Sequence, residues 1–595
     1  MHNLVIAEKP SVARTIAGVL HAAEKRKGYL EGNGWRISWC LGHLVEDAPP
    51  EAYDPRYKKW VWDDLPILPN PWKYRVVEST KEQYAVLAAL MNDSDVDSIV
   101  LATDAGREGE AIGRLVYQQC GCTKPVKRLW ISSLEDSAIQ KGFANLRRSA
   151  EFDNLYQAAV CRARADWLVG MNWSRAFTLH YHSETLHIGR VMTPTLALTV
   201  EREAAIMGFQ KEKFYTVELD LHGFRTASGR FPARADADSL RAACAGQPAI
   251  VRTIERKEKS EQPPKLYDLT SLQRDANRLL NLTAQQTLDT VQVLYEKRLV
   301  TYPRTDSRYL TADMAPGLPE LCEKAAAVLP FVKGVPSAVS VSRIVNDGKV
   351  TDHHAVIPTK EIAKADLSAL TPDERNILQM IAVRLLCAVE EPHRYAETAV
   401  TLDCGGASFS ARGRSVIEEG WKAVERAFRD ALKTKEKAEE EDAAPLPPLA
   451  EGQRVENAGA SVKEGSTKPP ARFTDDTLLA AMRNASAEEF SRIENPERTG
   501  LGTSATQAGI IEKLVSLKLL QRKKKSLIPT EAGVELIRIL PKEIKSAKLT
   551  AEWEEKLRQV ERGTLSPGVF LSGIENMTAE MIRSLRSEER RIGKE

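Results

Sequence analysis

A tyrosine followed two residues later by an arginine is the pattern with the clearest chemical potential in this sequence. It lies in the segment Thr301-Tyr-Pro-Arg-Thr-Asp-Ser307. A tyrosine hydroxyl can attack phosphorus and form a covalent intermediate, but a phenol is a weak nucleophile at neutral pH. Arg304 would supply the positive charge that favours the phenolate of Tyr302, and it could bind phosphate oxygens through paired hydrogen bonds. Taken alone, the segment also fits a tyrosine at a strand end before a proline turn.

Carboxylates follow two predicted strands of the N-terminal region. Glu8 ends a strand predicted at residues 3–7, and Asp104 and Glu108 follow a second one at 98–102. The carboxyl ends of parallel strands meet at one edge of a sheet, and hard oxygen ligands gathered there suit Mg²⁺. We therefore predict Glu8 and Asp104 as metal ligands, with Glu108 as a third ligand or a proton-transfer residue. The alternative is that Asp104 and Glu108 only cap the following helix.

Lys9 adjoins the first of these carboxylates. A lysine at a strand end beside a glutamate could protonate a leaving oxygen or neutralise a phosphate. We predict a catalytic role for it, and the alternative is an exposed loop lysine.

Strand and helix signals alternate up to about residue 150. A third strand is predicted at 128–131, and helices are predicted at 10–20, 108–117 and 135–147. This alternation indicates an α/β domain with a parallel sheet, whose ligands bind at the carboxyl ends of the strands.

Helices and β segments are separated along the remainder of the chain. Residues 152–210 read as helical, with arginines and aromatic residues interleaved, and 214–254 and 395–415 read as β. The two β segments flank a helical block at about 266–390 that contains the reactive tyrosine, which predicts one β domain interrupted by an inserted domain. Residues 433–448 carry mixed charges and then several prolines, which is typical of a linker.

Two stretches share the outline of an amphipathic helix, a basic turn and a short strand. In the first, Thr283-Ala-Gln-Gln286 resembles a capping box and precedes an apolar helix face ending at Tyr295. In the second, an apolar face over Ile510–Leu517 precedes the basic run Gln521-Arg-Lys-Lys-Lys-Ser526. The outline is that of a winged helix, a common nucleic-acid-binding unit, although two ordinary amphipathic helices would look alike.

Length and composition restrict the possible classes of protein. A chain of 595 residues predicts about three to five domains. Lys and Arg number 84 against 82 Asp and Glu, so nucleic acid would have to be bound by local basic patches. The eight cysteines lack zinc-ligand spacing, and no apolar stretch or leader predicts a membrane segment or export, so we expect a cytosolic protein. No Gly-x-x-x-x-Gly-Lys-Ser/Thr loop is found, which argues against ATP use.

Together these segments resemble the type IA DNA topoisomerases, and most closely the topoisomerase III subfamily. Residues 8–11 and 104–109 resemble the toprim metal-binding motifs of that family, and 301–307 resembles its active-site tyrosine motif. Four further segments resemble, in order, its DNA-groove helices, strand-binding turn, histidine motif and late gate motif: 162–175, 189–195, 352–359 and 500–506.

The resemblance implies a multidomain fold, α/β plus α plus β, in which a toprim domain and winged-helix-like domains form a toroidal arrangement. The toprim domain (I) would span 1–150, and the helical DNA-groove and gate domain (IV) 151–212 and 466–595. The β-rich hinge domain (II) would span 213–262 and 394–465. The winged-helix-like domain with the nucleophilic tyrosine (III) would span 263–393.

The resemblance also implies a reaction. Single-stranded DNA would be cut through a 5′-phosphotyrosyl link, another strand would pass, and the break would be resealed without ATP, relaxing negative supercoils, decatenating DNA, or both. The implied cofactor is Mg²⁺. The implied catalytic residues are Tyr302, Arg304, Lys9, Glu8 and His353. The implied DNA-binding residues are Arg162, Asp166, Arg175, Gly189, Arg190, Val191, Met192 and Thr193.

The implied partners are single-stranded DNA and negatively supercoiled or catenated DNA, with a helicase or single-strand-binding protein as helper. The protein would be a monomer, without membrane contact, in the cytoplasm and associated with the nucleoid.

Three positions depart from the family pattern. Gly106 stands where many relatives carry an aspartate, which favours one metal ion or a looser site. Met192 and Gln507 stand where glutamine and arginine are common, so the DNA contacts of relatives are not assigned to them. The C-terminal zinc ribbons of many bacterial relatives are also lacking.

Two other functions remain open from the residues alone. A toprim-type nuclease or primase would share Glu8, Asp104 and Glu108 but would not need Tyr302. A non-catalytic single-stranded DNA-binding protein would use the same basic grooves without chemistry.

Overall fold

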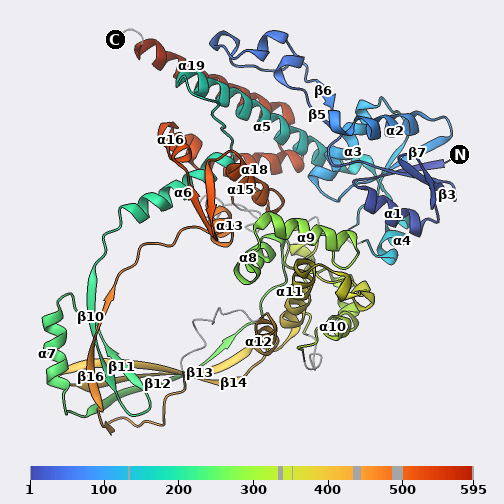
Figure 1. Ribbon diagram of the computed structural model, residues 1–595. Helices are drawn as coiled ribbons and strands as arrows, with labels where there is room; N and C mark the ends of the chain where they lie inside the picture. Colours follow the sequence, from blue (N-terminus) through green and yellow to red (C-terminus); the bar gives the residue numbers. More distant parts are fainter. Residues whose placement is uncertain are drawn as a thin grey trace.

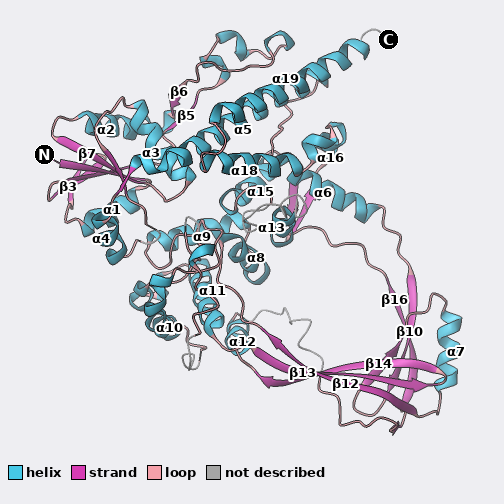
Figure 2. Cartoon of the chain, turned by 180° about the vertical axis from the view of Figure 1, so that it is seen from behind, coloured by secondary structure: helices cyan, strands magenta, loops and turns pink. Residues whose placement is uncertain are grey.

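The computed structural model describes residues 2–131, 134–332, 340–350, 353–432, 444–485 and 500–592. Figure 1 shows the elements along a ring-like path, with a mostly parallel sheet on one side and long helices at the top. An antiparallel sheet lies at the opposite end of the ring, and a block of helices connects it back to the parallel sheet, as Figure 2 also shows. In the described part of the chain, no helix is long and apolar enough to cross a membrane.

The N-terminal sheet has parallel strands at its centre. Their order is β4 (Trp35–Trp39), β1 (His2–Ala7), β7 (Val96–Ala102) and β8 (Val126–Arg128). Ala7 is in register with both Trp39 and Ala102, so these three strands end at the same edge. The residues that follow the strands are therefore brought together there. Antiparallel strands extend the sheet on both sides: β2 (Glu24–Arg26), β3 (Tyr29–Gly32) and β9 (Arg147–Arg148).

The helices of this region agree with the predicted alternation. They are α1 (Pro10–Val19), α2 (Lys81–Asn92), α3 (Arg107–Gln119) and α4 (Asp136–Ala144). Pro10 begins α1, where its missing N–H has no partner to lose. The predicted third strand, 128–131, was placed too late, because β8 ends at Arg128. Leu129 is buried and its N–H still donates to the Leu101 carbonyl of β7 at 2.9 Å, but the strand does not continue beyond it.

The second sheet is antiparallel throughout. Its order is β15 (Arg454–Val455), β12 (Ala249–Glu261), β13 (His393–Cys404), β14 (Ala407–Glu418), β11 (Arg225–Ser228), β10 (Lys213–Asp220) and β16 (Gly459–Ser466). β12 pairs with β13 along most of its length, so the segments before and after the helical block form one sheet. Helix α7 (Arg234–Cys244) interrupts the first β segment and was not predicted.

The helical block begins with α8 (Leu269–Leu280) and α9 (Ala284–Glu296). The predicted capping box is present, because the Gln286 N–H donates to Thr283 Oγ1 at 3.1 Å and the Thr283 N–H to Gln286 Oε1 at 2.9 Å. The predicted apolar face of α9 is buried. No hairpin follows α9 among the described residues; Val300 forms an isolated bridge with Pro358 instead. The other helices here are α10 (Leu318–Ala327) and α11 (Pro372–Val389), and α12 (Lys422–Ala431), which follows β14 in the chain, packs against α11.

The long helices at the top of Figure 1 form the remaining part. Here the second predicted outline is complete, because α15 (Ser504–Ser516) leads into a hairpin of β17 (Leu520–Lys523) and β18 (Ser526–Pro529). The other helices are α5 (Asp153–His180), α6 (Met192–Met207), α13 (Asp475–Asn484), α16 (Glu531–Ile539), α17 (Lys542–Lys545), α18 (Lys548–Glu561) and α19 (Pro567–Ile592). β5 (Val45–Asp47) and β6 (Tyr74–Val76) form a small two-stranded antiparallel sheet. Of the predicted linker, residues 433–443 lie outside the described residues.

Candidate active site

A cavity of about 300 Å³ lies where the parallel sheet, the helical block and the upper helices meet. Its walls come from segments that are far apart in the sequence, including the strand-end carboxylates and the tyrosine motif. Of the predicted site residues, the following line it: Glu8, Asp104, Glu108, Arg162, Tyr302, Arg304 and His353.

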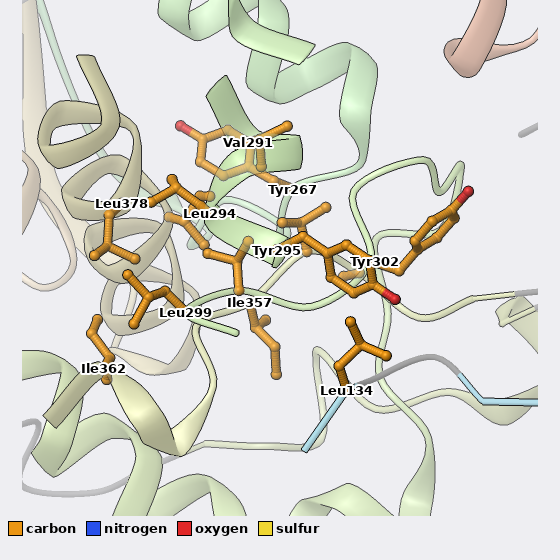
Figure 3. Close-up of a cluster of buried hydrophobic side chains, with 14 of the residues drawn as sticks. Leu134, Tyr267, Val291, Leu294, Tyr295, Leu299, Tyr302, Ile357, Ile362 and Leu378 are labelled. Carbon is orange, nitrogen blue, oxygen red and sulfur yellow. The ribbon is translucent and has the colours of Figure 1, made fainter. Parts of the chain in front are cut away.

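Tyr302 is only 7% exposed and lies at the border between this cavity and an apolar cluster. Figure 3 shows Tyr302 beside Tyr295 at the edge of this cluster, and the centres of the two rings are 5.4 Å apart. Burial raises the pKa of the Tyr302 phenol well above its usual value, and the nearby carboxylates of Asp104 and Glu8 add to this. Arg304 acts in the opposite direction. The phenol is therefore protonated at neutral pH and needs a proton acceptor when it reacts.

The tyrosine segment is held to the histidine segment by backbone and threonine hydrogen bonds. The Thr301 N–H donates to the Ile357 carbonyl at 3.0 Å, and the Thr305 hydroxyl donates to the His353 carbonyl at 3.0 Å. The centre of the His353 ring then lies 4.2 Å from that of Tyr302. The structure thus brings together two motifs separated by about fifty residues. Asp352, the first residue of the histidine motif, lies outside the described residues.

His353 contributes no positive charge at neutral pH. Its side chain is buried, which lowers its pKa to about 3, and His354 adds to this effect. A neutral imidazole can donate or accept a hydrogen bond, but it cannot act as a cationic clamp for phosphate.

Glu8 and Asp104 form a carboxylate pair at the edge of the sheet, as predicted from the strand ends. The Asp104 N–H donates to Glu8 Oε2 at 3.1 Å, and Glu8 is 4% exposed. Burial and the charge of Asp104 raise the pKa of Glu8 to about 8. Two adjacent carboxylates are hard oxygen donors whose mutual repulsion a divalent cation would relieve, so the donor set fits Mg²⁺.

Mg²⁺ is expected to stabilise the protein more at pH 8 than at pH 6. Because the pKa of Glu8 is raised to about 8, a proton must leave before a cation binds. The apparent affinity should fall by up to about tenfold for each pH unit below this value. Without metal, the contribution of Glu8 to stability changes with pH in the opposite direction. A glutamate in the unfolded chain has a pKa of about 4.3, so this contribution is lost as the pH rises from there to the pKa of Glu8 in the folded protein.

Thermal unfolding with and without Mg²⁺ at the two pH values measures this effect. In the Glu8→Gln variant, the Mg²⁺-induced shift in unfolding temperature should be the same at pH 6 and pH 8. Equal Mg²⁺-induced shifts at pH 6 and pH 8 in the wild-type protein would contradict the assignment.

Glu108, the predicted third ligand, does not join this pair. One carboxylate oxygen lies 2.8 Å from the Arg162 guanidinium, and the other lies 3.5 Å from His43 Nε2. Arg162 is the main cause that lowers the pKa of Glu108 to about 2, against the effect of burial. Among the described residues, no three His, Cys, Asp or Glu side chains are grouped so that they could hold a metal ion. The three-carboxylate site predicted from the sequence is therefore not assembled in this conformation.

Gly106 leaves room for one more carboxylate in the cavity. Its φ of 168° is extended, and a Cβ at this position would have no atom within 4 Å. Gly106→Asp is therefore expected to fold normally and to bind Mg²⁺ more tightly, by on the order of 1 kcal/mol or about fivefold. Calorimetric titration checks this, with Gly106→Asn as the uncharged control; equal affinities of the two variants would contradict it.

Lys9 is not among the residues that line the cavity, although its charge acts to lower the pKa of Glu8. Its catalytic role stays a prediction. Its ammonium group is 3.4 Å from the Glu296 carboxylate on α9. The pair joins the parallel-sheet region to the helical block, because α1 follows Lys9 directly and α9 precedes Tyr302. In this conformation Lys9 holds two parts of the molecule together.

Two arginines predicted to line a DNA groove are engaged elsewhere. Arg175 is buried, donates to the Tyr57 carbonyl at 2.8 Å and stacks on Trp60. Arg190 is also buried, and its guanidinium lies between Asp166 at 3.0 Å and Glu554 at 3.2 Å. Both predictions of groove contact are therefore unsupported here, and Arg162 alone of the three lines the cavity.

The predicted strand-binding turn at 189–193 leads into α6 and is not part of the cavity wall. The Gly189 N–H donates to Thr193 Oγ1 at 3.1 Å, and the side chains of Met192 and Thr193 are buried. Val191 lies next to the cavity residue Gly502, because a Cβ on Gly502 would lie 3.3 Å from its side chain.

Several residues of the cavity were not among the predicted site residues. They come from the start of α3, from α8, from α13, from α15 and the turn before it, and from α18: Arg107, Thr270, Arg483, Thr503, Gln507, Glu554 and Arg558. Arg107 lies within the toprim motif at 104–109, and Thr503 and Gln507 lie in or next to the gate motif at 500–506. The other four were missed. Glu554 and Arg558 are four residues apart on an amphipathic helix, where a solvent-exposed pair would have the same spacing.

Comparison with known proteins identifies the family of this chain. A family model described as DNA topoisomerase matches residues 150–572, and a Toprim domain model matches residues 3–134. This chain belongs to the DNA topoisomerase family. DNA topoisomerase 3 of Bacillus licheniformis is 41% identical over 608 residues, and that of Bacillus subtilis is 40% identical over 603. The alignments cover 99% and 98% of this topoisomerase and 82% of each relative.

The predicted resemblance to type IA topoisomerase III is thereby confirmed. Among solved structures, full-length topoisomerase I from Thermotoga maritima shares the fold, with a TM-score of 0.74 and 22% identity. That likeness covers 98% of this chain and 90% of the other. The family match over residues 150–572 disfavours a toprim nuclease or primase, in which Tyr302 would have no role.

Proposed function

We propose that this topoisomerase cuts and reseals single-stranded DNA in the cavity through a 5′-phosphotyrosyl link to Tyr302. The observation that carries this proposal is the shared wall: Tyr302, Arg304, Glu8 and Asp104 line one cavity. A phosphate placed there would face a nucleophile, a cation and two proton-transfer groups.

The reaction transfers two protons and replaces one phosphorus–oxygen bond with another. The Tyr302 oxygen attacks the phosphorus, and its proton passes to Asp104, whose carboxylate raises the pKa of the phenol and is therefore close enough to accept it. The bond between phosphorus and the 3′ oxygen breaks, and Glu8, whose pKa of about 8 keeps a proton available, protonates that oxygen. Arg304 stabilises the charge that develops on the phosphate. Resealing is the reverse sequence and needs no ATP.

Mg²⁺ would be held by Asp104 and by Glu8 in its deprotonated form, where it would neutralise and orient the DNA phosphates. Glu8 donates its proton to the 3′ oxygen only while it does not bind the ion. Arg162 contributes a cation from α5 to the same wall, and Arg107, Arg483 and Arg558 add three more. Their positive charge is suited to the backbone of a single strand.

Strand passage requires the helical block (263–393) to move away from both neighbours as domain III. The ring-like path of the chain in Figure 1 supports a toroidal arrangement with the toprim unit (1–150) as domain I. The antiparallel sheet (213–262 and 394–465) would be the hinge, domain II, and the upper helices (151–212 and 466–595) would form domain IV. The hairpin after α15 supports a winged helix in domain IV.

On this account the protein acts as a monomer in the cytoplasm, at the nucleoid. Its substrates are negatively supercoiled or catenated DNA, and a helicase or single-strand-binding protein would expose the single strand.

The experiment that tests the proposal uses one oligonucleotide labelled at either end. After incubation with Mg²⁺ and denaturation, the 3′-labelled strand should migrate with the protein, and the 5′-labelled strand should be released as a shorter fragment. If the 5′-labelled strand migrated with the protein instead, the 5′-phosphotyrosyl link would be excluded. Release of both fragments without protein would indicate a nuclease, and no cleavage would indicate a binding protein.

A further inference from the structure

Three of the carboxylates that line the cavity come from the two toprim motifs, but only two of these three are paired. Glu8 and Asp104 are joined at the sheet edge, whereas Glu108 is bound to Arg162 and His43. Glu108 lies in the first turn of α3, four residues after Asp104, and faces the same space. Its side chain therefore shares one cavity with the pair.

His43 is placed beside the site by the end of strand β4. The Cys40 N–H donates to the Ala7 carbonyl at 2.7 Å, and Gly42 turns the chain with a φ of 75°. The loop is thereby fixed next to Glu8, and His43 Nε2 lies 3.5 Å from Glu108 Oε2. No prediction from the sequence singled out His43.

The contact with His43 is the weaker of the two that hold Glu108. The side chains of His43 and Glu108 are 45% and 51% exposed, and water competes with a contact of this exposure. The contact with Arg162 is stronger, because Arg162 is the main cause of the lowered pKa of Glu108, so a competing anion is needed to break it. Arg162 is far less exposed, at 19%, and stays at the cavity wall. A DNA phosphate can offer this guanidinium two oxygens, whereas Glu108 now faces it with one.

We propose that Arg162 and His43 hold Glu108 away from the metal site until a DNA phosphate binds Arg162 and releases Glu108 to Glu8 and Asp104. This inference rests on the proposed metal site at that pair. His43 and Arg162 are then positioning residues for the third ligand, in addition to any contact with DNA. Because coupling between two ligands is reciprocal, the metal would tighten DNA binding by the same factor by which DNA tightens metal binding.

Binding of Mn²⁺ followed by electron paramagnetic resonance tests the coupling without relying on activity. The measurements use the Tyr302→Phe protein, which cannot cleave, with and without a saturating single-stranded oligonucleotide. DNA should tighten Mn²⁺ binding by about tenfold, as expected for completion of a ligand shell. His43→Ala should tighten Mn²⁺ binding several-fold in the absence of DNA and reduce the effect of DNA. His222→Asn, in the distant turn between β10 and β11, is the matched control and should change neither value.

A double-mutant comparison separates release of Glu108 from a simple loss of positive charge. Arg162→Gln should tighten Mn²⁺ binding without DNA, and most of this gain should vanish when Glu108→Gln is also present. Glu108→Gln alone should abolish the tightening caused by DNA. If Mn²⁺ binds equally with and without DNA, or if Glu108→Gln retains the full DNA effect, the inference is overturned while the two-carboxylate site stands. Absence of Mn²⁺ binding in every sample would reject both.

Discussion

Tyr302→Phe is expected to reduce formation of the covalent protein–DNA adduct by about 10³-fold or more, because no other group replaces a lost nucleophile. The variant should fold normally, since only the hydroxyl is removed and the ring keeps its contacts with Tyr295 and His353. Single-stranded DNA should still bind through the arginines of the cavity wall. Adduct formation is measured by denaturing electrophoresis with labelled DNA, and binding by fluorescence anisotropy.

Tyr295→Phe is the matched control for this variant. Tyr295 belongs to the same apolar cluster and its ring packs against that of Tyr302, but it does not line the cavity. Removing the Tyr295 hydroxyl should therefore change the amount of covalent adduct by no more than a few-fold. Substantial adduct with Tyr302→Phe, or loss of the adduct with Tyr295→Phe, would show that the nucleophile has been misassigned.

Arg304→Gln is expected to slow cleavage by about 10²- to 10³-fold, the usual effect of removing one group that stabilises developing charge. Arg304 lowers the pKa of the Tyr302 phenol, whereas burial and the carboxylates of Asp104 and Glu8 raise it. Without Arg304 the phenol should be harder to ionise, so the rate should keep rising to higher pH than in the wild-type enzyme. Single-turnover cleavage rates between pH 6 and pH 10 measure both effects.

Arg304→Lys should recover part of the rate, because it restores the charge without the paired hydrogen bonds. Arg278→Gln provides a control on α8, where the side chain is 47% exposed and pairs with Asp275 three residues earlier. If the dependence of the cleavage rate on pH has the same shape in Arg304→Gln as in the wild-type enzyme, Arg304 binds DNA without influencing the ionisation of the Tyr302 phenol.

The carboxylate pair and the tyrosine segment were predictable because their positions follow from local rules. Glu8 and Asp104 each come directly after an apolar strand, and parallel strands place their ends at one edge. The capping box at Thr283 similarly marked the start of α9 correctly. These signals depend on a few neighbouring residues and are little affected by the rest of the fold.

The arginines were predicted poorly because their roles depend on tertiary packing. Arg175 and Arg190 lie in helical segments and resemble groove residues in the sequence, yet each is buried against its own carbonyl or carboxylate partners. Arg483 and Arg558 reach the cavity from helices that follow Tyr302 by many residues. Glu108 was assigned to the metal because its distance from Asp104 along the chain allowed it, but spacing cannot show that Arg162 and His43 compete for its carboxylate.

The most direct test of the account is identification of the DNA-linked residue by mass spectrometry. The adduct is trapped by denaturation, the DNA is trimmed by nuclease, and the peptides are fragmented to locate the attached nucleotide. The account predicts a nucleotide joined through its 5′ phosphate to the oxygen of Tyr302. A nucleotide on any other residue, or one attached through its 3′ phosphate, would contradict it.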